Sequence, residues 1–181
     1  MIYLYDYCSP LGKISLASDG DALCGLWFED QKYFQSNLVK RVLGDGVDEN
    51  DAEAQRIIVD DASDISGIER AAAWLDTYFN GERMDEACKI SLHGSPFQEL
   101  VWDELTKIGY GQMTTYGDIA KSLEKRCGRP MSARAVGSAV GKNPISIIVP
   151  CHRVVGASGS LTGYAGGLER KRYLLELEGA I

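Results

Sequence analysis

The first thirty residues show the alternating apolar pattern of short β-strands. Apolar side chains gather at residues 2–5, 14–16 and 23–28, and the turn-forming segments Ser9–Gly12 and Ser18–Asp21 separate them. Alternation with a period of two residues between turn signals is typical of strands, and strands joined by short turns pair antiparallel. The N-terminal part of the chain is therefore predicted to form a small antiparallel sheet.

One helix is predicted to accompany this sheet. Ser66 and Glu69 have the spacing of a capping box, which opens a helix. The apolar residues that follow lie on one helical stripe: Ile68, Ala71, Ala72, Leu75, Tyr78 and Phe79. Residues 44–64 are acidic and lack periodicity, so a surface connection is predicted there, with the apolar run 57–59 as its one candidate interruption. The polar residues 82–94 are predicted to link two domains.

From residue 95 onward, apolar positions recur at helical spacing. Capping residues indicate two helix starts, at Ser95 and at Thr115, and further helices are predicted at 132–140 and 168–178. Two short helices joined by a turn, as predicted from Thr115 to residue 140, resemble a helix-turn-helix. The second of these helices consists mostly of small residues. It is either a tightly packed core helix or a helix that can approach a groove closely.

The chain is thus predicted to be an α/β protein with an N-terminal domain at 1–90 and a mainly helical domain at 91–181. Charge is divided unevenly between the two halves. Residues 1–94 hold eight basic and 18 acidic residues, a net charge of −10, whereas residues 95–181 hold 11 basic and eight acidic residues, a net charge of +3. A charge asymmetry of this sign favours a polyanionic partner for the second half.

The cysteines and the N-terminus indicate the compartment. The five cysteines are odd in number and irregularly spaced, and no signal-peptide pattern precedes them, so reduced thiols and a cytoplasmic location are predicted. No apolar run approaches the roughly 20 residues that span a membrane. One candidate zinc set is Cys8, Cys24, Cys88 and His93, but it lacks a close cysteine pair, and no metal site is predicted.

Cys151 is the candidate nucleophile. The apolar run 145–149 lies between two prolines and is predicted to be a buried extended segment that holds Cys151 in place. A buried cysteine is usually an inert apolar residue, but His152 and Arg153 follow this one, and a nearby base or cation favours the reactive thiolate. The glycine-rich segment 156–167 is either a flexible linker or, with Tyr164, a wall against a planar ligand.

Five short motifs in a fixed order resemble the O6-alkylguanine-DNA alkyltransferases, the methylated-DNA–protein-cysteine methyltransferases. The motifs are Tyr116–Gly117, Ala133–Gly137, Asn143–Pro144, Pro150–Val154 and Gly163–Gly167. The resemblance is dense over residues 95–180. It is looser in the N-terminal half, where it rests on Ser9–Gly12 and the strand pattern. It implies a ribonuclease-H-like N-terminal domain and a winged-helix-like C-terminal domain.

The resemblance implies roles for five residues in transferring an alkyl group from guanine to the protein. Cys151 matches the alkyl acceptor, His152 the base that deprotonates it through a water, and Glu178 the acid that orients the histidine. Tyr116 matches the tyrosine that rotates the 3′ phosphate and helps to protonate the departing base. Asn143 matches the residue that bridges the recognition helix and the active-site segment. Because water does not hydrolyse a thioether, each molecule would act once, without a cofactor.

The resemblance also implies how DNA is bound. The partner is double-stranded DNA with an O6-alkylguanine, held through the minor groove by a monomeric protein, and the damaged base is flipped out of the stack. Arg134 matches the residue that fills the vacated place, between the small residues Ala133 and Gly137. The family's guanine pocket is matched in this chain by Tyr164, the Ala165 backbone N–H and the Val154 carbonyl.

Two features depart from the family pattern. Residues 124–127 resemble an insertion in the turn of the helix-turn-helix, where Lys125, Arg126 and Arg129 would form either a solvated loop or extra phosphate contacts. Ala165 stands where some relatives have serine. Glu178 borders an apolar stripe at a helix C-terminus, where the helix dipole disfavours an acid, so we expect a compensating partner.

Three other functions would each predict a different sequence or behaviour. A non-catalytic lesion binder of the same fold would carry tryptophan in place of Cys151, and a helix-turn-helix regulator would carry a polar recognition helix. A Cys-His hydrolase would turn over many times. The retained sulfur and the small-residue helix favour alkyl transfer.

Overall fold

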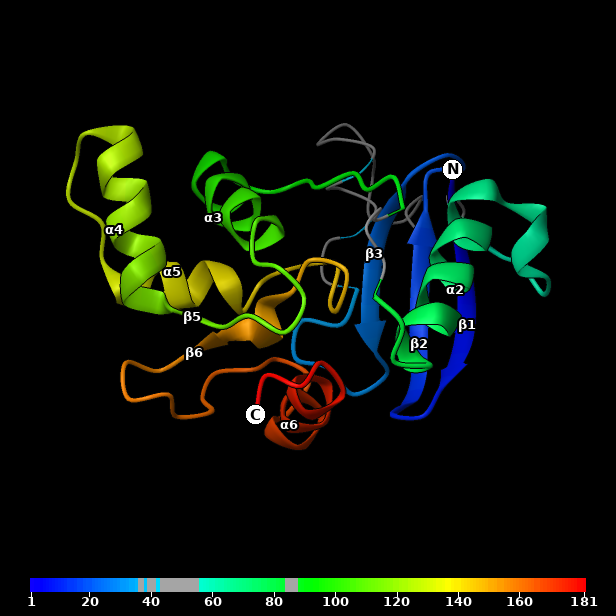
Figure 1. The fold of residues 1–181 in the computed structure, drawn as a ribbon. Helices are drawn as coiled ribbons and strands as arrows, with labels where there is room; N and C mark the ends of the chain where they lie inside the picture. Colours follow the sequence, from blue (N-terminus) through cyan, green and yellow to red (C-terminus); the bar gives the residue numbers. More distant parts are fainter. Residues whose placement is uncertain (36–37, 39–41, 43–55, 84–87) are drawn as a thin grey trace. The chain divides into compact units, whose positions relative to one another are not determined.

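The structure is a computed structural model that describes residues 1–35, 38, 42, 56–83 and 88–181. It divides into two compact units, unit 1 at Met1–His93 and unit 2 at Gly94–Ile181. The described part of unit 1 contains a four-stranded sheet and a long helix, and unit 2 is mainly helical with a helix-turn-helix (Figure 1). The predicted fold class is confirmed. Residues 44–55 of the predicted surface connection lie outside the described residues.

The sheet of unit 1 is mixed, because its fourth strand runs parallel to the first. The strand order is β3 (Leu23–Phe28), β2 (Gly12–Ser18), β1 (Ile2–Ser9), β4 (Arg56–Ile58). The pairs β1–β2 and β2–β3 are antiparallel as predicted, whereas Ile2 pairs in parallel with Arg56. The apolar run that interrupts the acidic segment is therefore an edge strand. Its pairing with β1 joins residues more than 50 positions apart in the sequence.

Helix α2 (Ser66–Phe79) has the predicted extent but not the predicted cap. Its N-cap is Ile65, which makes no side-chain capping bond, and the Ser66 hydroxyl donates to the Gly20 carbonyl at 3.2 Å instead. A short 3₁₀ turn, η1 (Ala62–Asp64), leads directly into the helix. Ile68, Ala71, Leu75 and Tyr78 of the predicted stripe are buried, whereas Ala72 and Phe79 are only partly buried, and α2 contacts β1, β2 and β3.

The predicted linker contributes to unit 1. The Leu23 N–H donates to the Lys89 carbonyl at 2.9 Å, and the Ser91 N–H donates to the Leu23 carbonyl at 2.8 Å. This segment therefore pairs with the free edge of β3 before the chain reaches unit 2.

Unit 2 is built on three helices that contact one another: α3 (Pro96–Thr106), α4 (Tyr116–Cys127) and α5 (Ala133–Val140). The predicted caps are present, since Ser95 forms a capping box and the Thr115 hydroxyl accepts from the Asp118 N–H at 3.1 Å. Buried Trp102 connects two of the helices, because its indole N–H donates to the Ala139 carbonyl at 2.9 Å.

The interpretation of residues 124–127 as a loop is wrong, because they form the last turn of α4. The helix ends at Gly128, whose φ of 67° is the left-handed conformation that glycine adopts at helix ends. Arg126 reaches back to α3, where its guanidinium lies 2.5 Å from Asp103 and 3.1 Å from Glu104. A charge that is neutralised within the protein in this way is not available for a phosphate.

The segment that leads to Cys151 is buried as predicted but not extended. It makes tight turns, with Ile147 at a φ of 67°, and continues into the 3₁₀ turn η2 (Cys151–Arg153). Two-residue strands β5 (Thr114–Thr115) and β6 (Val154–Val155) then pair in parallel, and α6 (Leu168–Leu177) closes the unit. None of the helices within the described ranges combines the length and the apolarity that crossing a membrane requires.

Candidate active site

Cys151 is buried, and so is the apolar segment that precedes it. The thiol-bearing residue is 5% exposed, and the apolar residues 145 and 147–149 before it are buried. A positive φ at a β-branched residue such as Ile147 is a strained conformation that persists only where the surroundings enforce it. The tight turn therefore fixes where the sulfur lies.

Asn143 supplies that enforcement. Its side-chain amide donates to the Val149 carbonyl at 2.7 Å, to the Ile145 carbonyl at 3.2 Å and to the Cys151 sulfur at 3.2 Å. Its oxygen accepts from the Ile145 N–H at 3.0 Å. Asn143 lies in the turn just after α5, where its N–H donates to the Val140 carbonyl at 3.2 Å, so one buried side chain connects the helix-turn-helix to the nucleophile.

His152 faces Glu178 through one ring nitrogen. Nε2 lies 2.7 Å from Glu178 Oε1, and both side chains are fully buried. Burial lowers the pKa of His152 in spite of the opposing charge of Glu178, so the ring is neutral at pH 7. With the proton on Nε2 towards the acid, Nδ1 carries a lone pair. Nδ1 is buried and has no hydrogen-bond partner among the described residues.

The partner that we expected for Glu178 is Arg153. Its Nε donates to Oε2 at 2.8 Å, its Nη2 donates to Oε1 at 2.9 Å, and the Gly111 N–H donates to Oε2 at 3.1 Å. Burial alone would raise the pKa of Glu178, but hydrogen bonds from His152 and Arg153 outweigh it and hold the pKa below its ordinary value. Glu178 is therefore an anion that fixes the histidine and its tautomer.

Lys171 is a buried charged residue that sequence reasoning missed. It lies on the inner face of α6 and is fully buried, and its ammonium donates to the Val154 carbonyl at 2.5 Å and to the Thr162 carbonyl at 2.7 Å. Burial lowers its pKa to about 8, against the opposing effect of Cys151. The available signal was its position, since Lys171, Leu174 and Glu178 follow the helical repeat of the buried stripe.

The Cys151 thiol is held neutral when nothing draws its proton away. Burial raises the pKa of Cys151, while the hydrogen bond from Asn143 and the charge of Lys171 work against that rise. A neutral thiol is a poor nucleophile. A nucleophilic role for Cys151 would therefore require a base to take its proton.

Tyr116 lies between two glycines. Its hydroxyl donates to the Thr162 carbonyl at 3.1 Å and lies 3.4 Å from the Gly163 carbonyl. A Cβ at Gly137 would lie 3.6 Å from its ring, and a Cβ at Gly163 would lie 2.8 Å from its hydroxyl. Burial and the nearby Cys151 raise the pKa of Tyr116. The glycine-rich segment is therefore a shaped wall that packs on the start of α4.

The other predicted residues divide between the interior and the surface. Val154 and Tyr164 are buried, and Ala165 is half-buried. Burial raises the pKa of Tyr164 well above its ordinary value, with a further contribution from Cys151. Ala133 and Arg134 lie on the exposed face of α5, opposite the buried Val136. That face consists of small residues and one long cation.

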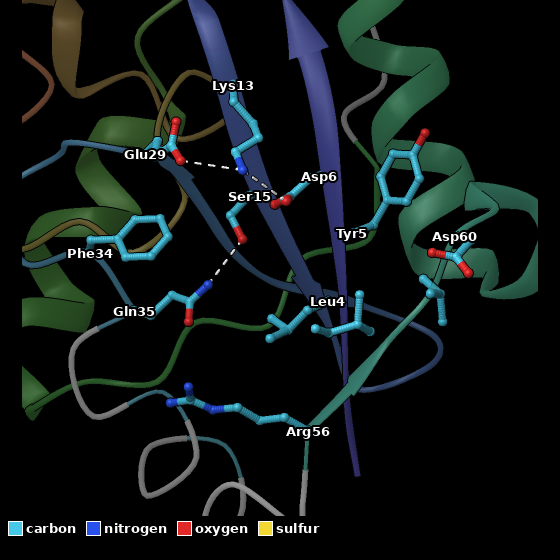
Figure 2. A pocket seen from close by; sticks show the side chains of 12 residues that line it. Leu4, Tyr5, Asp6, Lys13, Ser15, Glu29, Phe34, Gln35, Arg56 and Asp60 are labelled. Atoms are coloured by element: carbon cyan, nitrogen blue, oxygen red, sulfur yellow. Dashed lines mark hydrogen bonds and ion pairs between the residues drawn. The ribbon is translucent and has the colours of Figure 1, made fainter.

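Unit 1 has a cavity of about 670 Å³ that is lined by its own residues (Figure 2). Polar pairs on its wall partner one another: Lys13 bonds Asp6 at 3.1 Å and Glu29 at 3.3 Å, and Gln35 donates to Ser15 at 3.0 Å. Within the described ranges, no three metal-ligating side chains gather around a point that could hold an ion.

Family models match both units. The 6-O-methylguanine DNA methyltransferase ribonuclease-like domain matches residues 2–92, and the 6-O-methylguanine DNA methyltransferase DNA binding domain matches residues 96–180. A methylated-DNA–protein-cysteine methyltransferase of Mycobacterium leprae is 43% identical over 98% of this chain and 93% of its own length. One from Methanosarcina acetivorans is 40% identical over 99% of both chains.

A solved structure of a related protein is also similar to this chain. The crystal structure of Mycobacterium tuberculosis OGT in complex with DNA is similar to this chain with a TM-score of 0.76 and 38% identity. The similarity covers 97% of this chain and 92% of the other.

Proposed function

Because this chain belongs to the 6-O-methylguanine DNA methyltransferase family, we propose that it repairs DNA by moving an alkyl group from O6-alkylguanine to Cys151. It is a methylated-DNA–protein-cysteine methyltransferase that acts once per molecule. The observation that carries the proposal is a buried thiol followed directly by a neutral histidine whose far nitrogen bonds a buried carboxylate at 2.7 Å.

The reaction balances without a cofactor. His152 takes the Cys151 proton at Nδ1 through a water, while Glu178 and Arg153 stabilise the protonated ring. The sulfur attacks the alkyl carbon, an S–C bond forms, and the C–O6 bond breaks with its electrons passing to the guanine. Tyr116 helps to protonate the leaving base with its hydroxyl proton. The proton that left the Cys151 thiol then replaces the proton that Tyr116 donated, so the protons balance. The products are an S-alkyl cysteine and guanine.

The DNA is bound through the helix-turn-helix. The exposed face of α5 carries Arg134 among small residues such as Ala133 and Gly137, which suits a narrow minor groove. Arg134 would fill the stack after the base is flipped. The base would then lie against Tyr164, the Ala165 N–H and the Val154 carbonyl. We further propose that the protein acts as a cytoplasmic monomer.

A stoichiometry experiment tests the transfer. The protein is mixed with a duplex oligonucleotide that contains one O6-methylguanine, and the products are mapped by peptide mass. We expect one methyl group per chain, on the peptide with Cys151, and none in Cys151→Ser. Cys127→Ser, which removes a cysteine from α4, is the matched control and should be methylated like the wild type. Repeated turnover, or methylation at another residue, would contradict the proposal.

A further inference from the structure

One buried side chain touches or approaches three parts of the proposed site. The Lys171 ammonium donates to the Val154 carbonyl at 2.5 Å and to the Thr162 carbonyl at 2.7 Å. The Thr162 carbonyl also accepts from the Tyr116 hydroxyl at 3.1 Å. Lys171 therefore ties the proposed base pocket, through Val154, to the proposed proton donor.

The burial of Lys171 needs an explanation beyond packing. A lysine with no exposed surface has lost the water that solvates an ammonium, and two carbonyls replace that water only in part. A neutral apolar residue of the same length would fill the position at a lower cost. The charge is therefore expected to act on another group, and Lys171 and Cys151 each perturb the pKa of the other.

We propose that Lys171 is a positioning residue of the alkyl-transfer site. Its ammonium binds the Val154 and Thr162 carbonyls and so fixes the proposed base pocket relative to Tyr116. Its positive charge also favours the Cys151 thiolate over the thiol. This inference rests on the proposed function.

The charges around Lys171 come from several elements, and each bears on a pH profile. Cys151 and His152 lie on η2, and Lys171 opposes the protonation of that histidine. Four further groups interact with Cys151 or His152: Tyr116 on α4, Tyr164 in the glycine-rich segment, Arg153 on η2 and Glu178 after α6. Among these groups, Lys171 is the cation whose charge favours the Cys151 thiolate. Removing the lysine should thus move the pH at which the thiolate forms to higher values.

The test compares Lys171→Met and Lys171→Arg with Arg172→Met, which removes an exposed cation from the same helix. Single-turnover methyl transfer from the oligonucleotide is followed at several protein concentrations, which separates DNA affinity from the rate at saturation, and at several pH values. We expect Lys171→Met to lower the saturating rate about tenfold or more and to move the rising limb of the pH profile upward, with little change in affinity. Lys171→Arg should keep the wild-type limb, and Arg172→Met should match the wild type.

Two results would overturn the inference. One is a Lys171→Met saturating rate within about twofold of the wild type. The other is a slower rate with the wild-type pH limb, which would mean that the lysine is only structural. Should Lys171→Met fail to fold, judged by circular dichroism, the same criteria apply to Lys171→Gln, whose amide still donates to one carbonyl. A wild-type protein that transfers no methyl group would instead refute the proposed function itself.

Discussion

Removing Arg153 would test the interior of unit 2 most directly. Arg153 and Glu178 form a two-pronged ion pair at 2.8 and 2.9 Å, with side chains that are 9% and 0% exposed. Arg153→Met keeps much of the apolar stem but deletes both charge-assisted hydrogen bonds to the carboxylate. Breaking a buried ion pair by removing one partner typically costs about 3–5 kcal/mol, because the other charge is left uncompensated.

The assay is thermal unfolding followed by circular dichroism at pH 7, with Arg172→Met as the exposed control. A domain of about 60–100 residues loses roughly 4–8 °C per kcal/mol, so the melting temperature of unit 2 should fall by at least about 12 °C. A loss below about 1 kcal/mol, the range of an exposed ion pair, would refute the buried geometry.

The pH dependence of the loss gives a second, independent check. The pKa of Glu178 in the folded protein lies below its ordinary value of 4.5, so its contribution to stability is complete above that pH and declines as pH falls below it. Arg153→Met raises that pKa and removes the contribution. The difference between wild type and variant should therefore be largest at neutral pH and shrink below about pH 4.5. An equal difference at pH 7 and pH 3.5 would mean that packing alone explains the loss.

Three further predictions concern the site. His152→Gln should slow methyl transfer about 10²–10⁴-fold with DNA affinity unchanged, measured by single-turnover kinetics and fluorescence anisotropy. Gly163→Ala forces a side chain to a φ of 66° with its Cβ 2.8 Å from the Tyr116 hydroxyl, so unfolding should show a loss of about 1–2 kcal/mol together with slower transfer. Methylation should destabilise the protein by about 1–3 kcal/mol, because Cys151 is 5% exposed and its shell must accommodate an extra carbon. Thermal unfolding before and after reaction measures this, and Cys151→Ser should show no change.

Local signals in the sequence predicted the elements well. Ser95 and Thr115 cap their helices as expected, because a cap depends on a few neighbouring residues. Ser66 has the same local pattern and does not cap, since the Gly20 carbonyl far away in the sequence accepts its hydroxyl proton. Strand β4 was missed as a strand for a similar reason. Its pairing with β1 is parallel and long-range.

The site shows the same division between local and long-range information. Resemblance to a family indicated Cys151, His152 and Glu178. The sequence pointed to Arg153 only as a cation next to Cys151, and it gave Lys171 no role, because their contacts with Glu178 and Val154 lie 25 and 17 residues away. The segment before Cys151 was wrongly interpreted as extended. A short apolar run between prolines indicates burial, whereas the turn depends on hydrogen bonds from Asn143.

Helix α6 explains why these charges occur together. Lys171 and Glu178 are seven residues apart, which is about two helical turns, so both face the interior on one stripe. One helix thus brings a cation to the nucleophile and an anion to its base. The lysine favours the thiolate, and the glutamate favours the imidazolium that forms when the proton moves, with an effect on His152 larger than the opposing effect of Lys171. Apolar residues at both positions would pack the unit as well or better. The cost of burying these two charges is therefore best explained by proton transfer from Cys151 to His152.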